Sequence, residues 1–459
     1  MFHPFAQRRE TVPQAKGEGE LRRSIGLVRA TALVVGTIIG ASIFVQPSEI
    51  TGRVPSVAGV FAVWLVAGAL TFFGAIVTAE LASAFPRTGG VYVFLKEAFS
   101  PALGFLWGWA MFWSMHSGII AAIAVVFARY VGYFTPLGDV GVRLVAIGVI
   151  LILSTVNLVG VRQGSAVQTA FTIGKVAAIA VIILVGFLMG PRAVVARADV
   201  SRAAAFAGAS FSLGDFALAL VAGLFAFGGW HMVTYSAGET RDPERTIPWA
   251  LLAGTLIVTA CYVALNAVYL RVLPLEIVIS STRVAADAAD AVLGSGGGAL
   301  MSALVIFSTF GALSGIILAG PRVYYSMARE GHVFEWVGAL HARFRTPHRA
   351  IVLQAAWASV LVATGTYRAL FTRVIYTEWL FFALLAVGVL LLRRRQGYAP
   401  SYRTWGYPLV PLVFAVSSVL IVVNQVGSDP GESMSGLLLV LLGLPVYHLW
   451  LRITRSAER

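Results

Sequence analysis

The chain is divided into apolar stretches that are each long enough to cross a lipid bilayer. Residues 57–81, 142–158 and 409–426 each contain few or no charges, and a run of about 20 apolar residues spans the hydrocarbon core as a helix. Apolar residues make up 58% of the 459 residues and charged residues 12%, whereas a soluble domain carries about 25% charged residues. The sequence therefore predicts an all-α integral membrane protein.

We expect about twelve transmembrane helices, joined by loops too short to hold a soluble domain. Alternate loops carry about 24 and about 10 Lys and Arg residues, and the richer set marks the cytoplasmic side. Both termini are therefore predicted in the cytoplasm. The expected helices lie near residues 25–47, 54–84, 92–133, 142–160, 165–190, 211–237, 247–272, 297–327, 350–366, 370–392, 408–426 and 434–452.

The net charge of +13 does not predict nucleic-acid binding, because the basic residues follow this topology. The run 393–395 (Arg-Arg-Arg) is interpreted as an anchor at the lipid headgroups. The single cysteine, Cys261, lies inside an apolar segment and cannot form an internal disulfide. Residues 1–24 and 453–459 are expected to be cytoplasmic tails, with no cleavable signal peptide in the polar first segment.

Two expected helices contain glycine-rich runs in their middle. Residues 36–44 (GTIIGASIF) interrupt the first helix, and residues 224–231 (LFAFGGWH) interrupt the sixth. Glycine tolerates non-helical angles, and backbone released at membrane depth must line a polar cavity or bind a ligand. Interruptions in the first and sixth helices are what two inverted five-helix repeats would produce at the bilayer midplane. The repeats would cover residues 25–190 and 211–395, followed by two further helices in 408–452.

One such run could also be a packing motif, because Gly36-x-x-x-Gly40 lets neighbouring helices approach closely. Two runs in corresponding positions favour a binding site. The helix that resumes after a break offers free N–H groups that suit a carboxylate, and the helix that stops offers carbonyl groups that suit an ammonium.

Two such breaks would hold an α-amino acid by its head. The predicted carboxylate donors are the N–H groups at Ala41, Ser42 and Ile43, which follow Gly40. The predicted ammonium acceptors are carbonyl groups near Ile38, Phe225 and Gly228. The pocket for the substrate's side chain would then be formed by nearby residues, with Phe225, Trp230 and His231 as candidates.

Several stretches, in this order, resemble the amino acid–polyamine–organocation superfamily and, more narrowly, the prokaryotic L-type amino acid transporter family. They are GTIIGASIF (36–44), AEL followed by TGG (79–90), LFAFGGW (224–230), GETRDPERTIPWAL (238–251), AREGH (328–332) and GLPVY (443–447). The resemblance implies a leucine-transporter-like fold, sodium-independent amino acid exchange and location in the cell inner membrane. Eukaryotic relatives pair with a single-span glycoprotein through an outside cysteine between helices 3 and 4. Residues 130–142 contain none, so we expect no such partner.

Lys175 is an ionisable residue within the fifth expected helix, where a charge costs about 2.5–3.5 kcal/mol on insertion scales. Related folds hold a sodium ion between helices 1, 5 and 8, and the resemblance implies that this lysine is a tethered substitute. It would tie helix 5 to the carbonyl end of the first half of helix 1, near Gly36. The alternative is that its ammonium extends to the cytoplasmic surface.

Three further polar residues lie in expected helices. His116 and Glu378 are candidate pocket residues, as is His231, although a lone histidine in an apolar helix is often only hydrogen-bonded to a neighbour. The family usually has an arginine near His116 and an asparagine near His231 and Glu378. Ser42 also replaces a family glycine, so it would either narrow the pocket or donate a hydrogen bond to the carboxylate.

Other functional classes lack support in the sequence. Gly174-Lys175 has neither the upstream glycine nor the following hydroxyl of a phosphate-binding loop, and the Cys and His spacing fits no metal site. We expect no cofactor, no metal and no enzymatic activity. The nearest alternative is a proton-coupled amino acid symporter, in which Lys175, His116 or Glu378 carries the proton. A membrane-embedded amino acid sensor is the alternative from another class.

Overall fold

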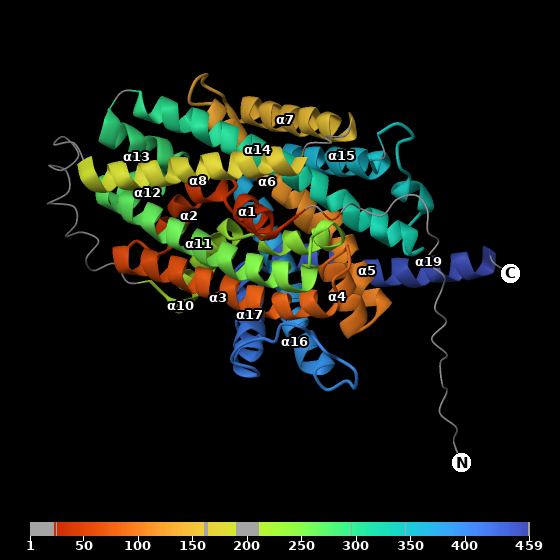
Figure 1. Ribbon diagram of the computed structural model, residues 1–459. Coiled ribbons are helices and arrows are strands. Elements are labelled where there is room, and N and C mark those ends of the chain that lie inside the picture. The colour runs from red at the N-terminus through yellow and green to blue at the C-terminus, as the bar shows by residue number, and fades with distance from the viewer. Residues whose placement is uncertain are drawn as a thin grey trace, which may run out of the picture.

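Helices form most of the part of the chain described by the computed structural model, which covers Arg23 and residues 25–159, 164–189, 211–294, 296–344 and 346–457 (Figure 1). The helices are α1 (Leu27–Ile38), α2 (Gln46–Arg53), α3 (Val57–Ala84), α4 (Val91–Ala98), α5 (Pro101–Ala110), α6 (His116–Val131), α7 (Asp139–Val159), α8 (Gly164–Met189), α10 (Leu213–Ala226), α11 (Pro243–Val272), α12 (Leu275–Ser280), α13 (Val284–Leu293), α14 (Gly297–Arg329), α15 (His348–Thr364), α16 (Tyr367–Leu392), α17 (Leu409–Ser428), α18 (Pro430–Leu441) and α19 (Gly443–Ala457). Four short segments are η1 (Ser42–Phe44), η2 (Met111–Met115), η3 (Trp230–Glu239) and η4 (Glu335–Gly338).

Within these described ranges, ten helical segments are long and apolar enough to span a membrane. Two further segments complete the expected set. The first is α1 with α2, which together form an interrupted first helix, and the second is the 17-residue α15. The predicted class, an all-α membrane protein of about twelve helices, is confirmed. Of the expected tails 1–24 and 453–459, residues 1–22, 24, 458 and 459 lie outside the described residues, and residues 453–457 continue α19.

The structure differs from the predicted helix boundaries in four places. The third predicted helix, 92–133, is divided into α4 and a continuous segment of α5, η2 and α6, because Pro101 starts a new helix after the Ser100 cap. The second half of the sixth, η3, is a 3-10 helix. The expected loop 273–298 contains α12 and α13, which are too short to span a bilayer and were therefore missed. The twelfth is divided into α18 and α19.

The interrupted first helix lies among the other helices. In Figure 1, α1 and α2 occupy the middle of the bundle, between α7 and α14 on one side and α3 and α17 on the other. Helix α1 contacts α11, α8, η3 and α14, and its second half is largely buried, whereas its first turn is exposed. We call the face of the molecule that carries Ile25 and the start of α1 the N-terminal face. The face that carries α2 and the start of α10 is the opposite face.

Helix α10 enters the bundle from the opposite face with a defined start. The Ser212 hydroxyl accepts the Asp215 N–H at 3.0 Å, and the Asp215 carboxylate accepts the Ser212 N–H at 3.1 Å. This capping box satisfies two backbone donors that would otherwise have no partner. It fixes the point from which α10 runs inward to its break.

Candidate functional site

The first break follows Ile38, where α1 stops. The Gly40 N–H donates to the Ile38 carbonyl at 2.7 Å, and the chain continues through η1 before α2 begins. In the described part of the chain, the N–H groups of Ala41, Ser42 and Ile43 have no backbone acceptor. Three consecutive free donors at membrane depth form a site for an anionic group.

Lys175 on α8 binds the carbonyl end of α1. Its ammonium donates to the Gly36 carbonyl at 3.1 Å and to the Ile39 carbonyl at 2.7 Å, and the residue is only 3% exposed. The side chain therefore does not extend to a membrane surface. A cation at this position also stabilises the negative end of the helix dipole.

The second break follows Ala226, where α10 stops. Gly229 has φ +91°, and a Cβ there would lie 3.2 Å from the Thr37 carbonyl oxygen, so the position requires glycine in both conformation and space. The Thr37 hydroxyl lies 3.2 Å from the Gly229 carbonyl. The two breaks are therefore in direct contact.

Tyr262 on α11 connects the same two breaks. Its hydroxyl lies 3.0 Å from the carbonyl oxygens of both Ile38 and Ala226, and its ring packs edge-on against Trp64 at 5.5 Å. Sequence reasoning missed this residue, because a tyrosine in a long apolar helix carries no signal of what it faces.

A small cavity of about 20 Å³ lies between the breaks, which is room for about one water molecule. Its lining from the interrupted helices is Thr37, Ile38, Gly40, Ser42, Phe225, Gly228, Gly229 and Met232. The lining from α6, α14 and α16 is Ile119, Ile123, Ile316, Val374 and Glu378. Five residues predicted at the breaks and the candidate Glu378 are thus brought together. The apolar residues from α6, α14 and α16 were missed because they lie on uninterrupted helices.

Other candidates lie outside this cavity. The side chains of Ala41 and Ile43 are buried but do not line it. His116 is held in the helix packing, with its Nε2 2.7 Å from the Ile316 carbonyl. His231 lies in an aromatic cluster with Trp107, Trp230, Tyr235 and Phe382, and Trp230 packs against Phe382 at 5.1 Å. The aromatic cluster packs against the second break on the side away from the small cavity.

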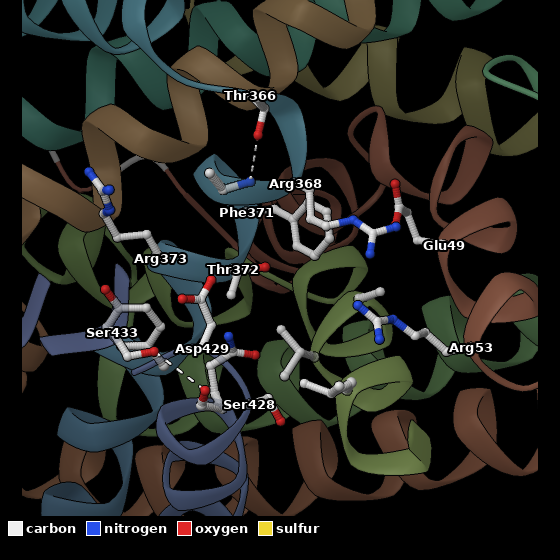
Figure 2. Close-up of a pocket in the computed structure, with 16 residues that line it drawn as sticks. Glu49, Arg53, Thr366, Arg368, Phe371, Thr372, Arg373, Ser428, Asp429 and Ser433 are labelled. Carbon is white, nitrogen blue, oxygen red and sulfur yellow. Dashed lines mark hydrogen bonds and ion pairs between the residues drawn. The ribbon is translucent and has the colours of Figure 1, made fainter. Parts of the chain in front are cut away.

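A larger cavity, the vestibule, opens on the opposite face (Figure 2). It has a volume of about 340 Å³ and is lined by residues from α2, α10, α16, α17 and α18. Figure 2 shows the Arg368 guanidinium directed at the Glu49 carboxylate, with which it forms an ion pair, and Arg53 beneath them. Phe371 lines the vestibule and packs at 5.5 Å on Phe225, which lines the small cavity. This aromatic pair separates the two cavities.

The N-terminal face is closed by pairing between the start of the chain and the end of η3. The Ile25 N–H donates to the Glu239 carbonyl at 3.1 Å, and the Arg241 N–H donates to the Ile25 carbonyl at 2.9 Å. Arg322 of α14 forms an ion pair with the Glu239 carboxylate at 3.2 Å. The small cavity is therefore closed toward this face as well.

A second cluster on the N-terminal face joins α4 to the end of α14. The Tyr92 hydroxyl and the Lys96 ammonium both donate to the Glu330 carboxylate. Burial alone would raise the pKa of Glu330, but these two donors bring it below its ordinary value. The carboxylate is thus held ionised at neutral pH.

Comparisons with known proteins find amino acid transporters. A family model for amino acid permeases matches residues 25–445. The serine/threonine exchanger SteT of Bacillus subtilis (strain 168) is 32% identical over 434 residues, which are 93% of this chain and 97% of the exchanger. The b(0,+)-type amino acid transporter 1 of Homo sapiens is 32% identical over 440 residues, 94% of this chain and 88% of the relative. The cystine/glutamate transporter of Homo sapiens is 28% identical over 444 residues, 96% of this chain and 87% of the relative.

Proposed function

The chain belongs to the amino acid permease family, and we propose that it moves α-amino acids across the membrane by sodium-independent exchange. The relatives named above are transporters and exchangers rather than enzymes. The observation that carries the proposal is the pair of helix breaks around one cavity, with three free N–H groups on one side. Such breaks at mid-membrane are the substrate sites of secondary transporters.

The substrate's carboxylate binds the N–H groups of Ala41, Ser42 and Ile43. Its ammonium binds carbonyl groups at the breaks. The Gly228 carbonyl accepts no hydrogen bond in the described part of the chain, whereas the Ile38 and Phe225 carbonyls already accept from Gly40 and Gly228. We therefore assign the ammonium to the Gly228 carbonyl, because the Ile38 carbonyl also lies 3.0 Å from the Tyr262 hydroxyl and the Phe225 carbonyl also accepts from the Phe227 N–H.

Lys175 supports transport without sodium. Its ammonium is a fixed cation on the Gly36 and Ile39 carbonyls, so the end of α1 needs no metal ion to offset its partial negative charge. A change in the Lys175 contacts would alter the position of α1. Because α1 runs from the N-terminal face to the first break, this movement would connect substrate binding to the contacts that close that face.

Two contacts separate the cavity from the opposite face, namely the aromatic pair Phe225–Phe371 and the ion pair Glu49–Arg368. The Ile25–Glu239 pairing separates the cavity from the N-terminal face. Alternating access opens one of these two sets at a time. In this structure both sets of contacts are closed, and the cavity between them has a volume of only about 20 Å³.

We further propose that the N-terminal face is cytoplasmic, that the membrane is the cell inner membrane and that no disulfide-linked partner is needed. The excess of basic residues in alternate loops supports the orientation. The chain has one cysteine, Cys261, and it lies in α11 rather than between α6 and α7. Labelling of cysteines introduced at Gly138 and Gly397 from either side of the membrane tests the orientation.

The function is tested by a thermal-shift screen of the purified protein against the common amino acids, followed by uptake into proteoliposomes. Only a ligand that binds the folded state raises the unfolding temperature. Uptake that requires internal amino acid and is unchanged when sodium is replaced by choline supports exchange. Uptake into empty vesicles driven by a pH gradient would favour proton symport, and the absence of any amino acid that binds would contradict the proposal.

A further inference from the structure

One carboxylate lines the small cavity, and we propose that it receives the cationic side chain of the substrate, so that this site takes α-amino acids with a basic side chain. The carboxylate belongs to Glu378 on α16. This proposal rests on the proposed function, because it assumes that the substrate's head is held at the two breaks. It adds the chemical class of the side chain.

Glu378 is enclosed by the protein and yet lies at the cavity. The residue is 3% exposed, and it lines the cavity one helical turn after Val374. The Thr37–Ile38 and Gly228–Gly229 segments of the two breaks line the same cavity. A group bound at the breaks is therefore adjacent to this carboxylate.

Glu378 has no partner among the described residues. It makes no hydrogen bond or ion pair there, whereas Glu80, the other carboxylate buried inside a span, accepts two hydrogen bonds from Arg393 at 2.8 and 2.7 Å and one from the Thr404 N–H at 2.7 Å. A buried carboxylate is normally paired, because burying an unpaired charge is costly. A cation that enters the cavity would supply the partner that an ionised Glu378 lacks.

Two cations near the first break and the vestibule, Lys175 and Arg368, are already bound to other groups. The Lys175 ammonium is bound to two carbonyls of the first break, and Arg368 is paired with Glu49 on the opposite face. The remaining cavity walls from α6, α14 and α16 are apolar, namely Ile119, Ile123, Ile316 and Val374. An incoming cation is the group that these surroundings lack.

The substrate's α-ammonium does not need this carboxylate, because the Gly228 carbonyl accepts no hydrogen bond in the described part of the chain and is available to it. A second positive group on the same substrate molecule would need this carboxylate as its partner. An ammonium or guanidinium on the side chain provides one, and a guanidinium can bind a carboxylate with two parallel hydrogen bonds. The site therefore fits an amino acid with two cationic groups.

Room for such a side chain requires the cavity to enlarge from about 20 Å³. Met232 lines it, and an unbranched thioether side chain rearranges readily. Phe225 also lines it and separates it from the vestibule. Movement of these two side chains would open space without disturbing the backbone at either break.

The test uses the full-length protein in lipid nanodiscs and two matched ligand pairs, lysine with norleucine and arginine with citrulline. Within each pair the side chains are similar in size but only the first is cationic. Calorimetry should give wild-type dissociation constants that are lower for the cationic member by at least about tenfold. In Glu378→Gln this ratio should fall to about one, while Glu330→Gln, which alters a carboxylate on the N-terminal face, should keep the wild-type ratio.

Each other outcome overturns the proposal. A wild-type ratio near one excludes a cation-selective pocket, and this comparison needs no variant, so it decides the question even if Glu378→Gln fails to fold. A Glu378→Gln protein that keeps the ratio assigns the selectivity elsewhere. Equal weakening of both members of a pair places the carboxylate at the substrate's α-ammonium. Failure of every amino acid to bind contradicts the proposed function itself, whereas binding of neutral amino acids alone contradicts only this inference.

Discussion

The two helix breaks share a cavity but are held in different ways. The first, after α1, is held by the Lys175 ammonium on the Gly36 and Ile39 carbonyls and leaves three N–H groups free. The second, after α10, is held by packing, because η3 carries Trp230 and His231 into an aromatic cluster with Phe382. The first break is thus fixed mainly by charge and hydrogen bonds, and the second by shape.

The difference indicates separate tasks for the breaks. A charge-assisted contact can respond to a bound carboxylate or to a change in hydration, whereas a close-packed aromatic cluster changes little until several rings move together. Tyr262 and Thr37 contact both breaks and connect the two. We therefore expect the first break to sense the substrate and the second to act as a rigid frame.

The largest effect is expected from Lys175→Ala, which removes the charged support of the first break. Hydrogen bonds to charged groups contribute about 1.5–3 kcal/mol each, and two carbonyls would lose them, so exchange in proteoliposomes should fall by about 100-fold or more. Gly174→Ala is the control, since a Cβ there meets no atom within 4 Å. A normal rate in a well-folded Lys175→Ala protein would remove the fixed-cation role.

Gly229→Ala tests the frame at the second break. Its φ of +91° is unfavourable for alanine by about 1–2 kcal/mol, and the new Cβ would press on the Thr37 carbonyl. The unfolding temperature should fall by a few degrees and exchange by about tenfold. Gly148→Ala on α7, where a Cβ meets nothing within 4 Å, should be neutral or stabilising. Equal behaviour of the two variants would show that the second break adapts freely.

Tyr262→Phe tests the connection between the breaks. The ring packing on Trp64 stays, but the hydroxyl 3.0 Å from the Ile38 and Ala226 carbonyls is lost. A net loss of about 1 kcal/mol is expected, with exchange slowed by about fivefold. Tyr269→Phe on the same helix is the matched control, because the buried Tyr269 hydroxyl has no partner in the described residues. If both variants exchange at the same rate, the two breaks are not coupled through Tyr262.

The smallest effect is expected from Ser42→Gly, which changes the lining of the first break without changing its support. Loss of the Cβ and hydroxyl should raise uptake of larger amino acids relative to smaller ones by less than about tenfold. Ser280→Gly is the control, because it removes the same atoms from an exposed serine at the end of α12, away from the cavity. Competition assays with amino acids of increasing size measure the change. Unchanged selectivity in Ser42→Gly would mean that its side chain does not face the substrate.

Much of this arrangement could be predicted from local sequence. The apolar runs and the glycine-rich segments 36–44 and 224–231 predicted the membrane class and the positions of both interruptions, and the family resemblance is confirmed by the matching family model and relatives. Short helices such as α12 and α13 could not be predicted, because their length carries no transmembrane signal.

The sequence by itself determined where the helices can bend, because only glycine accepts a position such as Gly229 without strain. It also predicted that Lys175 and Glu378 lie within membrane-spanning helices, although the Lys175 ammonium could still have reached a membrane surface. The tertiary structure decided what those two residues face. Lys175 contacts two carbonyls of the first break, Glu378 lines the cavity without a partner among the described residues, and His116 and His231 are turned into the packing. The physical reason is that a side chain's direction on an apolar helix depends on how the helix is rotated against its neighbours, and that rotation is set by contacts between residues far apart in the chain.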